Sequence, residues 1–186
     1  GDVIAKINDE ETTDLSVDEA VNKIRGEAGT DVKLGLIRSD TPLELTITRA
    51  QITVPSVKSE ILAGNIGYLQ ITRFSDDTAG LAAAAARDFK AKNVKGVVLD
   101  VRNNGGGLLS SAVDVAGLWL NNKVVVQEKE GERVRSTLRS GNNPVLADVP
   151  TTILINEGSA SASEILAGAL HDHGVAKLLG KKTFGK

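Results

Sequence analysis

The stretch from Val98 to Leu108 reads VLDVRNNGGGL and combines an apolar run with a glycine-rich loop. Residues 94–101 are mostly apolar over the length of a strand, as expected for a strand buried on both faces of a parallel sheet. The three glycines that follow can adopt φ values that other residues avoid. Backbone N–H groups in such a loop can converge on an anion or a developing oxyanion. The pattern predicts a buried strand that ends in a binding loop, although the glycines alone fit a flexible turn equally well.

Strand and helix patterns alternate on both sides of this stretch, which favours an α/β layer structure for the larger part of the chain. We expect strands at 67–72, 94–101, 123–128, 151–155 and 176–179, and helices at 78–92, 111–120 and 161–170. Residues 129–143 are a polar stretch with no predicted element.

The first 50 residues have a different order of elements, namely strand, helix and hairpin. The expected strands are 3–8, 32–38 and 43–49, with apolar residues at helical spacing from Val17 to Ile24. Residues 51–63 contain Pro55 and no clear period, so we expect a connecting segment with room for an edge strand. The predicted organisation is a module at 1–50, a connection at 51–63 and a core at 64–186.

The composition excludes several classes of function. The 186 residues carry a net charge of −2 and 3 % aromatic residues, which is unlike a nucleic-acid-binding domain. The chain lacks cysteine, so disulfides, thiolate catalysis and cysteine-ligated zinc are ruled out. Its two histidines, His171 and His173, lie two apart on a predicted helix end and point in different directions. We therefore expect no metal and no cofactor.

No apolar run reaches the roughly 18 residues that a membrane span needs. The chain opens without methionine on Gly1 and ends at Lys186 in a loop pattern, so we interpret it as part of a longer protein. We expect Lys186 to be exposed in this partial chain, and the partial chain to be inactive by itself.

A second loop with catalytic potential spans residues 156–164, between a predicted strand and a predicted helix. A serine at a helix N-terminus meets free N–H groups and the positive end of the helix dipole. The alternative is that Ser159 is only a helix cap. No histidine is well placed as a base, which leaves lysine, and spacing alone does not choose among Lys177, Lys181, Lys182 and Lys186.

Three blocks of this sequence resemble the carboxy-terminal processing peptidases, also called tail-specific serine proteases. The blocks run from Val98 to Leu108, from Gly158 to Leu170 and from Gly180 to Lys186, in the order found in the family. The resemblance implies that Ser161 is the nucleophile and Lys186 the general base of a Ser-Lys dyad. It also implies an oxyanion hole made by the N–H of Ala162 and one from the glycine loop, Gly107 or its neighbour Gly106.

The family pattern sometimes adds an aspartate to the dyad, which corresponds to Asp172 here. A carboxylate near the base would favour the charged lysine and oppose its use as a base, so we expect Asp172 to be structural.

The resemblance also implies a crotonase/Clp-protease-like βαβ core and a partial PDZ domain, an α+β module, at residues 1–50. The expected activity is endoproteolytic cleavage near the C-terminus of protein substrates with apolar tails, which the PDZ module recruits. The implied location is extracytoplasmic, in the periplasm, cell envelope or thylakoid lumen, and a homo-oligomer is left open. Two alternatives stay in view, a crotonase-like acyl-CoA enzyme and a catalytically inactive PDZ-bearing binding protein.

Overall fold

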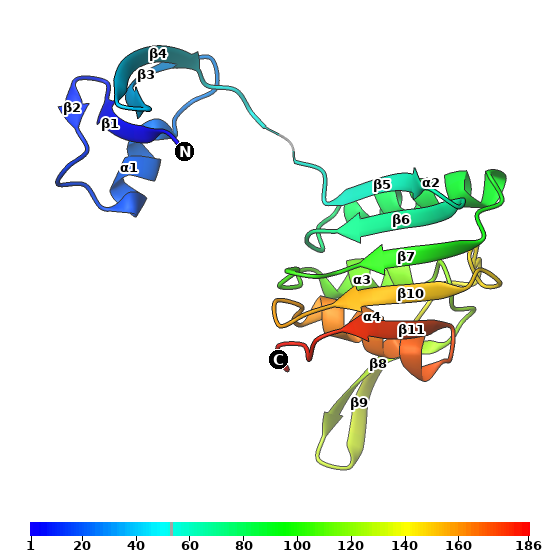
Figure 1. Cartoon of the computed structure of the whole chain (residues 1–186). Helices are drawn as coiled ribbons and strands as arrows, with labels where there is room; N and C mark the ends of the chain where they lie inside the picture. Colours follow the sequence, from blue (N-terminus) through cyan, green and yellow to red (C-terminus); the bar gives the residue numbers. More distant parts are fainter. Residues whose placement is uncertain (53) are drawn as a thin grey trace. The chain divides into compact units, whose positions relative to one another are not determined.

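The computed structural model describes residues 1–52 and 54–186 of the chain. The chain divides into two compact units, Gly1–Val54 and Pro55–Lys186 (Figure 1). The expected connecting segment 51–63 therefore spans the boundary, and its residue 53 lies outside the described residues. Each unit is described here by itself.

The first unit is a four-stranded antiparallel sheet in the order β2-β1-β3-β4, with one helix packed against it. Its elements are β1 (Val3–Ile7), β2 (Glu10–Glu11), α1 (Val17–Ile24), β3 (Asp31–Arg38) and β4 (Thr41–Thr48). The core is small, with four buried apolar side chains, those of Ile7, Val32, Leu34 and Leu36. The strand, helix and hairpin expected from the sequence all form.

The second unit is built on a five-stranded sheet in the order β11-β10-β7-β6-β5 (Figure 1). Its strands are β5 (Val57–Leu62), β6 (Ile66–Ile71), β7 (Gly96–Asp100), β10 (Thr151–Ile155) and β11 (Ala176–Gly180). The strands β6, β7, β10 and β11 are parallel, whereas β5 is an antiparallel edge strand. The carboxyl ends of β7 and β10 therefore meet at one edge, which is where open α/β sheets bind their ligands.

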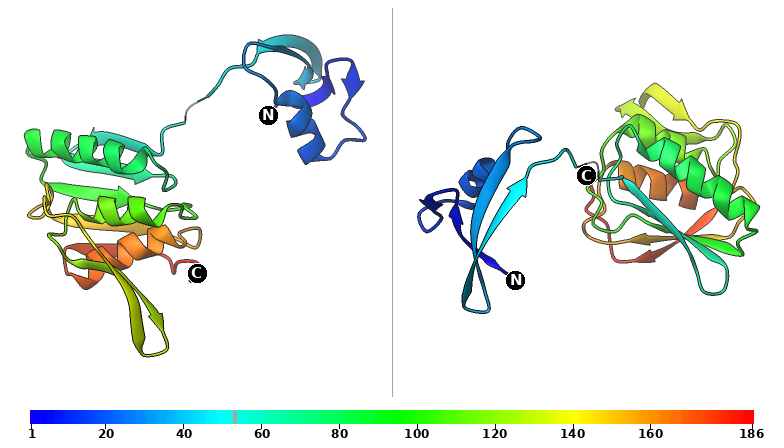
Figure 2. Two further views of the ribbon diagram at one scale, coloured as in Figure 1. Left: turned by 180° about the vertical axis from the view of Figure 1, so that it is seen from behind. Right: turned by 90° about the horizontal axis from the view of Figure 1, so that it is seen from above.

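Three helices lie on one face of this sheet (Figure 2). They are α2 (Thr78–Ala91), α3 (Leu109–Ala116) and α4 (Ala162–Asp172). Inward-facing residues of the parallel strands, such as Leu69, Leu99 and Ile153, are fully buried beneath them. No helix in the described ranges is long and apolar enough to cross a membrane. The expected mixed α/β fold is confirmed for this unit.

One element departs from the sequence-based expectation. The polar stretch 129–143 contains β9 (Arg133–Arg139), which pairs with β8 (Val124–Glu130) in an antiparallel hairpin. Every residue of β9 is exposed, so the strand has no buried face to produce an alternating apolar pattern. Backbone pairing across the turn at Gly131, where φ is 58°, forms the hairpin instead.

Candidate active site

The glycine loop after β7 adopts a backbone that only glycine permits. Gly107 has φ of 139°, and a Cβ there would lie 2.0 Å from the carbonyl oxygen of Phe74. The loop is fastened to the β6–α2 connection because the N–H of Phe74 donates to the Gly106 carbonyl, and that of Leu108 to the Phe74 carbonyl, both at 2.9 Å. The glycine loop is thus hydrogen-bonded to the β6–α2 connection on both sides of Gly107.

The three serines of the second loop have different environments. Ser159 and Ser163 are fully buried, and their hydroxyls donate to the carbonyls of Val101 and Asn104 at 2.8 Å each. Ser161 is partly exposed and has φ of 55° and ψ of −116° just before α4. This conformation is strained for a residue with a Cβ, and such strain clusters at active sites. Of the three serines, Ser161 is the one that combines partial exposure with a strained backbone.

Asn104 joins the glycine loop to the serine turn. Its side chain donates to the carbonyl of Ile71 at 2.8 Å and accepts the N–H of Gly106 at 2.9 Å. Its own carbonyl accepts the N–H of Ala160 at 3.0 Å. The two loops pack so closely that a Cβ on Gly106 would lie 2.9 Å from the Cβ of Ser161. Asn104 is fully buried, so these bonds are shielded from water.

Two backbone N–H groups beside Ser161 are available for an oxyanion. Among the described residues, neither Ala162 nor Gly107 uses its N–H in a hydrogen bond. The Gly106 N–H is occupied by Asn104, and the Ser161 N–H by Glu164. This pattern favours Ala162 and Gly107 over Gly106 as oxyanion donors.

Glu164, in the first turn of α4, accepts hydrogen bonds from several backbone N–H groups. Its Oε2 accepts the N–H of Ser161 at 2.9 Å and that of Lys186 at 3.1 Å, and its Oε1 accepts the N–H of Gly185 at 2.7 Å. Burial opposes the charge of Glu164, but hydrogen bonds from the Thr183 side chain and from these N–H groups outweigh it. The pKa of Glu164 is therefore lowered, and the group is held as a carboxylate.

The side chains of Lys186 and Asp172, the other two residues considered for catalysis, lie apart from the Ser161 side chain. Lys186 is exposed as expected, and within the described residues no hydrogen bond or ion pair joins its amine to Ser161. Asp172 is the last residue of α4, about 16 Å along the helix from Ser161, and its exposed carboxylate contacts His171 at 3.3 Å. The structure thus brings the backbone of Lys186 to the site and leaves Asp172 at the far end of the helix.

The other lysines considered from the sequence, Lys177, Lys181 and Lys182, are exposed. Lys181 pairs with Glu157 at 3.7 Å. In the part of the chain that the structure describes, no cluster of histidine and acidic side chains could hold a metal ion.

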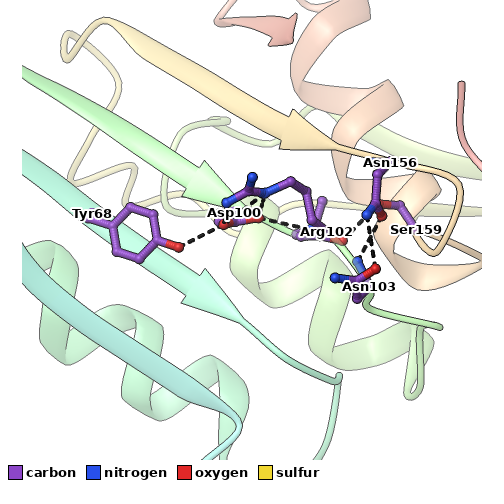
Figure 3. Close-up of polar contacts among 7 residues, drawn as sticks. Tyr68, Asp100, Arg102, Asn103, Asn156 and Ser159 are labelled. Atoms are coloured by element: carbon purple, nitrogen blue, oxygen red, sulfur yellow. Dashed lines mark hydrogen bonds and ion pairs between the residues drawn. The ribbon is translucent and has the colours of Figure 1, made fainter. Parts of the chain in front are cut away.

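An ion pair between the buried Asp100 and the exposed Arg102 supports the start of the glycine loop (Figure 3). The Asp100 carboxylate, 1 % exposed at the end of β7, accepts from Arg102 Nη2 at 2.6 Å and from the Tyr68 hydroxyl at 2.7 Å. Burial alone would raise the pKa of Asp100, but the bonds from Arg102 and Tyr68 lower it. Beside it, the Asn103 N–H donates to Asn156 Oδ1 at 2.8 Å, which ties the two loops together again.

The sequence pointed to both loops and to Ser161 but not to the roles of Asn104, Phe74 and Glu164. One signal for Glu164 was present, since Ser161 and Glu164 have the serine-x-x-glutamate spacing of a capping box. The bonds of Asn104 and Phe74 join segments far apart in the chain, and no local pattern reveals them.

Proteins of similar sequence and similar structure are known. The profile of peptidase family S41 matches residues 65–186. A Staphylococcus haemolyticus protein named probable CtpA-like serine protease is 40 % identical over 187 residues, covering 100 % of this chain and 38 % of that protein. A carboxyl-terminal-processing protease of Synechocystis sp. is 37 % identical over 191 residues, covering 100 % of this chain and 44 % of that protein.

A solved structure of a photosystem II D1 C-terminal processing protease superposes with a TM-score of 0.68 at 30 % identity. The match covers 100 % of this chain and 52 % of that one. The chain thus spans about half, or less, of the length of these relatives. Family match, sequence identity and superposition agree, and the chain belongs to peptidase family S41, with the carboxyl-terminal processing proteases among its relatives.

Proposed function

We propose that this chain carries the catalytic serine of an endopeptidase that cleaves protein substrates near their C-terminus through a Ser-Lys dyad. The observation that carries the proposal is the backbone at Ser161. It combines a strained conformation, partial exposure and two unused N–H groups, those of Ala162 and Gly107, on adjoining segments. Ser161 is also the N-cap of α4, in a capping box with Glu164, but capping alone requires neither the strained backbone nor the unused N–H groups.

In the proposed reaction, Ser161 Oγ attacks the scissile carbonyl while the neutral amine of Lys186 takes its proton. The N–H groups of Ala162 and Gly107 stabilise the oxyanion, and the positive end of the α4 dipole adds to their effect. The intermediate collapses as Lys186 returns the proton to the leaving amine. Water then attacks the acyl-enzyme and gives one proton to Lys186. Lys186 passes that proton to Ser161 Oγ as the acyl bond breaks, which regenerates the neutral amine and the free serine and releases the product acid, which ionises to its carboxylate.

The first unit fits the proposed role of a partial PDZ domain that recruits the substrate tail, because its strand-helix-hairpin order is that of the later part of such a domain. PDZ domains bind peptide C-termini by strand addition. The crotonase/Clp-protease-like description of the second unit and an extracytoplasmic location are likewise proposed from the family resemblance. Membership of a peptidase family favours this function over the acyl-CoA alternative.

The test compares alanine variants of the three serines in the full-length protein, with cleavage of an unfolded protein and labelling by a fluorophosphonate as readouts. Ser161→Ala should abolish both. Ser159→Ala loses two hydrogen bonds, to Val101 and from Asn156, and Ser163→Ala loses one, to Asn104. Each lost bond costs about 1 kcal/mol of stability, but both variants should keep most of the activity. Activity and labelling retained by Ser161→Ala would refute the assignment.

A further inference from the structure

The segment after β11 reaches the serine turn through a small number of contacts. Lys181 donates its N–H to Ile155 at 3.2 Å, and Phe184 donates its N–H to Ser159 at 3.0 Å. For the last two residues, Gly185 and Lys186, the backbone N–H groups bond to Glu164 alone within the described chain. Glu164 is therefore the group that fixes the backbone from which the Lys186 side chain departs.

The local backbone suits this arrangement. Gly185 has φ of 84°, a left-handed conformation that favours glycine. Consecutive N–H groups near such a residue can converge on one anion, and here the anion is a side chain of the protein itself. The same carboxylate also accepts the N–H of Ser161. The Glu164 side chain thus hydrogen-bonds to the backbone of Ser161, the expected nucleophile, and to that of Lys186, the expected base.

We propose that Glu164 is a positioning residue, which clamps the backbone of Gly185 and Lys186 onto the Ser161 turn so that the Lys186 amine can reach the Ser161 hydroxyl. The proposal rests on the Ser-Lys dyad proposed above. The clamp requires a hydrogen-bond acceptor at both carboxylate oxygens of Glu164. Glutamine keeps the shape but offers one acceptor oxygen, so either the bond at Oε1 or the pair at Oε2 is lost.

The clamp is tested first in this chain by amide hydrogen exchange. Glu164→Gln should speed exchange at Gly185 and Lys186 by at least about tenfold, while Leu69 in the central sheet is unchanged. Thr183→Val removes only the hydroxyl bond to Glu164 and should give a smaller change of the same sign. Unchanged exchange at Gly185 and Lys186 in both variants would overturn the clamp, whatever the catalytic mechanism.

The consequence for catalysis is tested by a double-mutant cycle in the full-length protein. A misplaced base costs on the order of 100-fold, so Glu164→Gln should lower kcat by about that factor with KM little changed. In a Lys186→Ala background, the same change should alter the residual rate less than about twofold. Glu157→Gln is the control, an exposed acid of the same turn that pairs with Lys181, and it should leave kcat unchanged.

Two outcomes separate this proposal from the dyad itself. Equal losses from Glu164→Gln with and without Lys186 would show that Glu164 acts on something other than the base, and would overturn the positioning role while leaving the dyad intact. Full activity in Lys186→Ala would instead overturn the dyad. A kcat unchanged in both Glu164→Gln and Thr183→Val would also refute the positioning role.

Discussion

At the N-terminal end of α4, Ser161 is strained, partly exposed and close to unused N–H groups, whereas at the C-terminal end Asp172 is exposed and its carboxylate contacts the neighbouring His171. The two ends belong to one helix and differ because of the helix dipole and the supporting loops. The N-terminus concentrates positive potential and free donors, and the glycine loop packs against it. The difference teaches that, of these two acids, it is Glu164 in the first turn of the helix that hydrogen-bonds to the Ser161 turn.

The largest effect is expected at the proposed base. Lys186→Arg keeps the positive charge but cannot become neutral at any usable pH, so it should lower kcat by at least about 10³-fold, as Lys186→Ala does. The measurement is peptide cleavage in the full-length protein. Lys182→Arg, an exposed lysine of the same segment, is the matched control and should keep its rate. Substantial activity in Lys186→Arg would rule the mechanism out.

The next effect concerns the contact between the glycine loop and the serine turn. A Cβ on Gly106, where φ is 102°, would lie 2.9 Å from the Ala160 carbonyl oxygen and from Ser161 Cβ. Gly106→Ala should therefore displace the oxyanion site, reduce kcat by about 100-fold and lower stability by about 1–3 kcal/mol. Gly105→Ala meets no atom within 4 Å and should change both quantities little. Equal behaviour of the two variants would contradict this packing.

A smaller effect of opposite sign is expected between the two ends of the helix. Gly168 lies inside α4, and a Cβ there would meet no atom within 4 Å. Gly168→Ala should raise stability by about 1 kcal/mol, or roughly 2–4 °C in Tm, without loss of activity. Gly80→Ala, also in open space but in the first turn of α2, should give a smaller gain. A fall in Tm for Gly168→Ala would mean that the space beside it is filled.

The smallest effect contrasts the two acids directly. Because the pKa of Glu164 is lowered from its ordinary 4.5, its contribution to stability is complete above that pH and is lost as the pH falls through the lowered value. The Tm difference between wild type and Glu164→Gln should therefore shrink between pH 6 and pH 3. Asp172→Asn, at the other end, should keep cleavage within about twofold of wild type. A larger loss of cleavage activity in Asp172→Asn would show that Asp172 takes part in catalysis.

Much of the fold followed from local patterns. The apolar runs that became β7 and β10 and the alanine-rich segment that became α2 were evident because buried parallel strands and helices carry their signal in consecutive residues. The strand β9 escaped prediction because all of its residues are exposed and its partner, not its own composition, makes it a strand. The edge strand β5 was expected only as an option for the same reason, since pairing with β6 defines it.

The sequence by itself indicated where the candidate site lies, because glycines and small residues at the ends of buried strands permit close backbone approach in any surrounding. Through its resemblance to a family, the sequence also identified Ser161 as the candidate nucleophile and Lys186 as the candidate base. Only the tertiary structure decided which serine is strained and exposed, which N–H groups are unused, and that Glu164 joins Ser161 to Lys186. Apart from the local bond between Ser161 and Glu164, the hydrogen bonds behind those properties join segments more than 20 residues apart, and they form only when the sheet has brought those segments together.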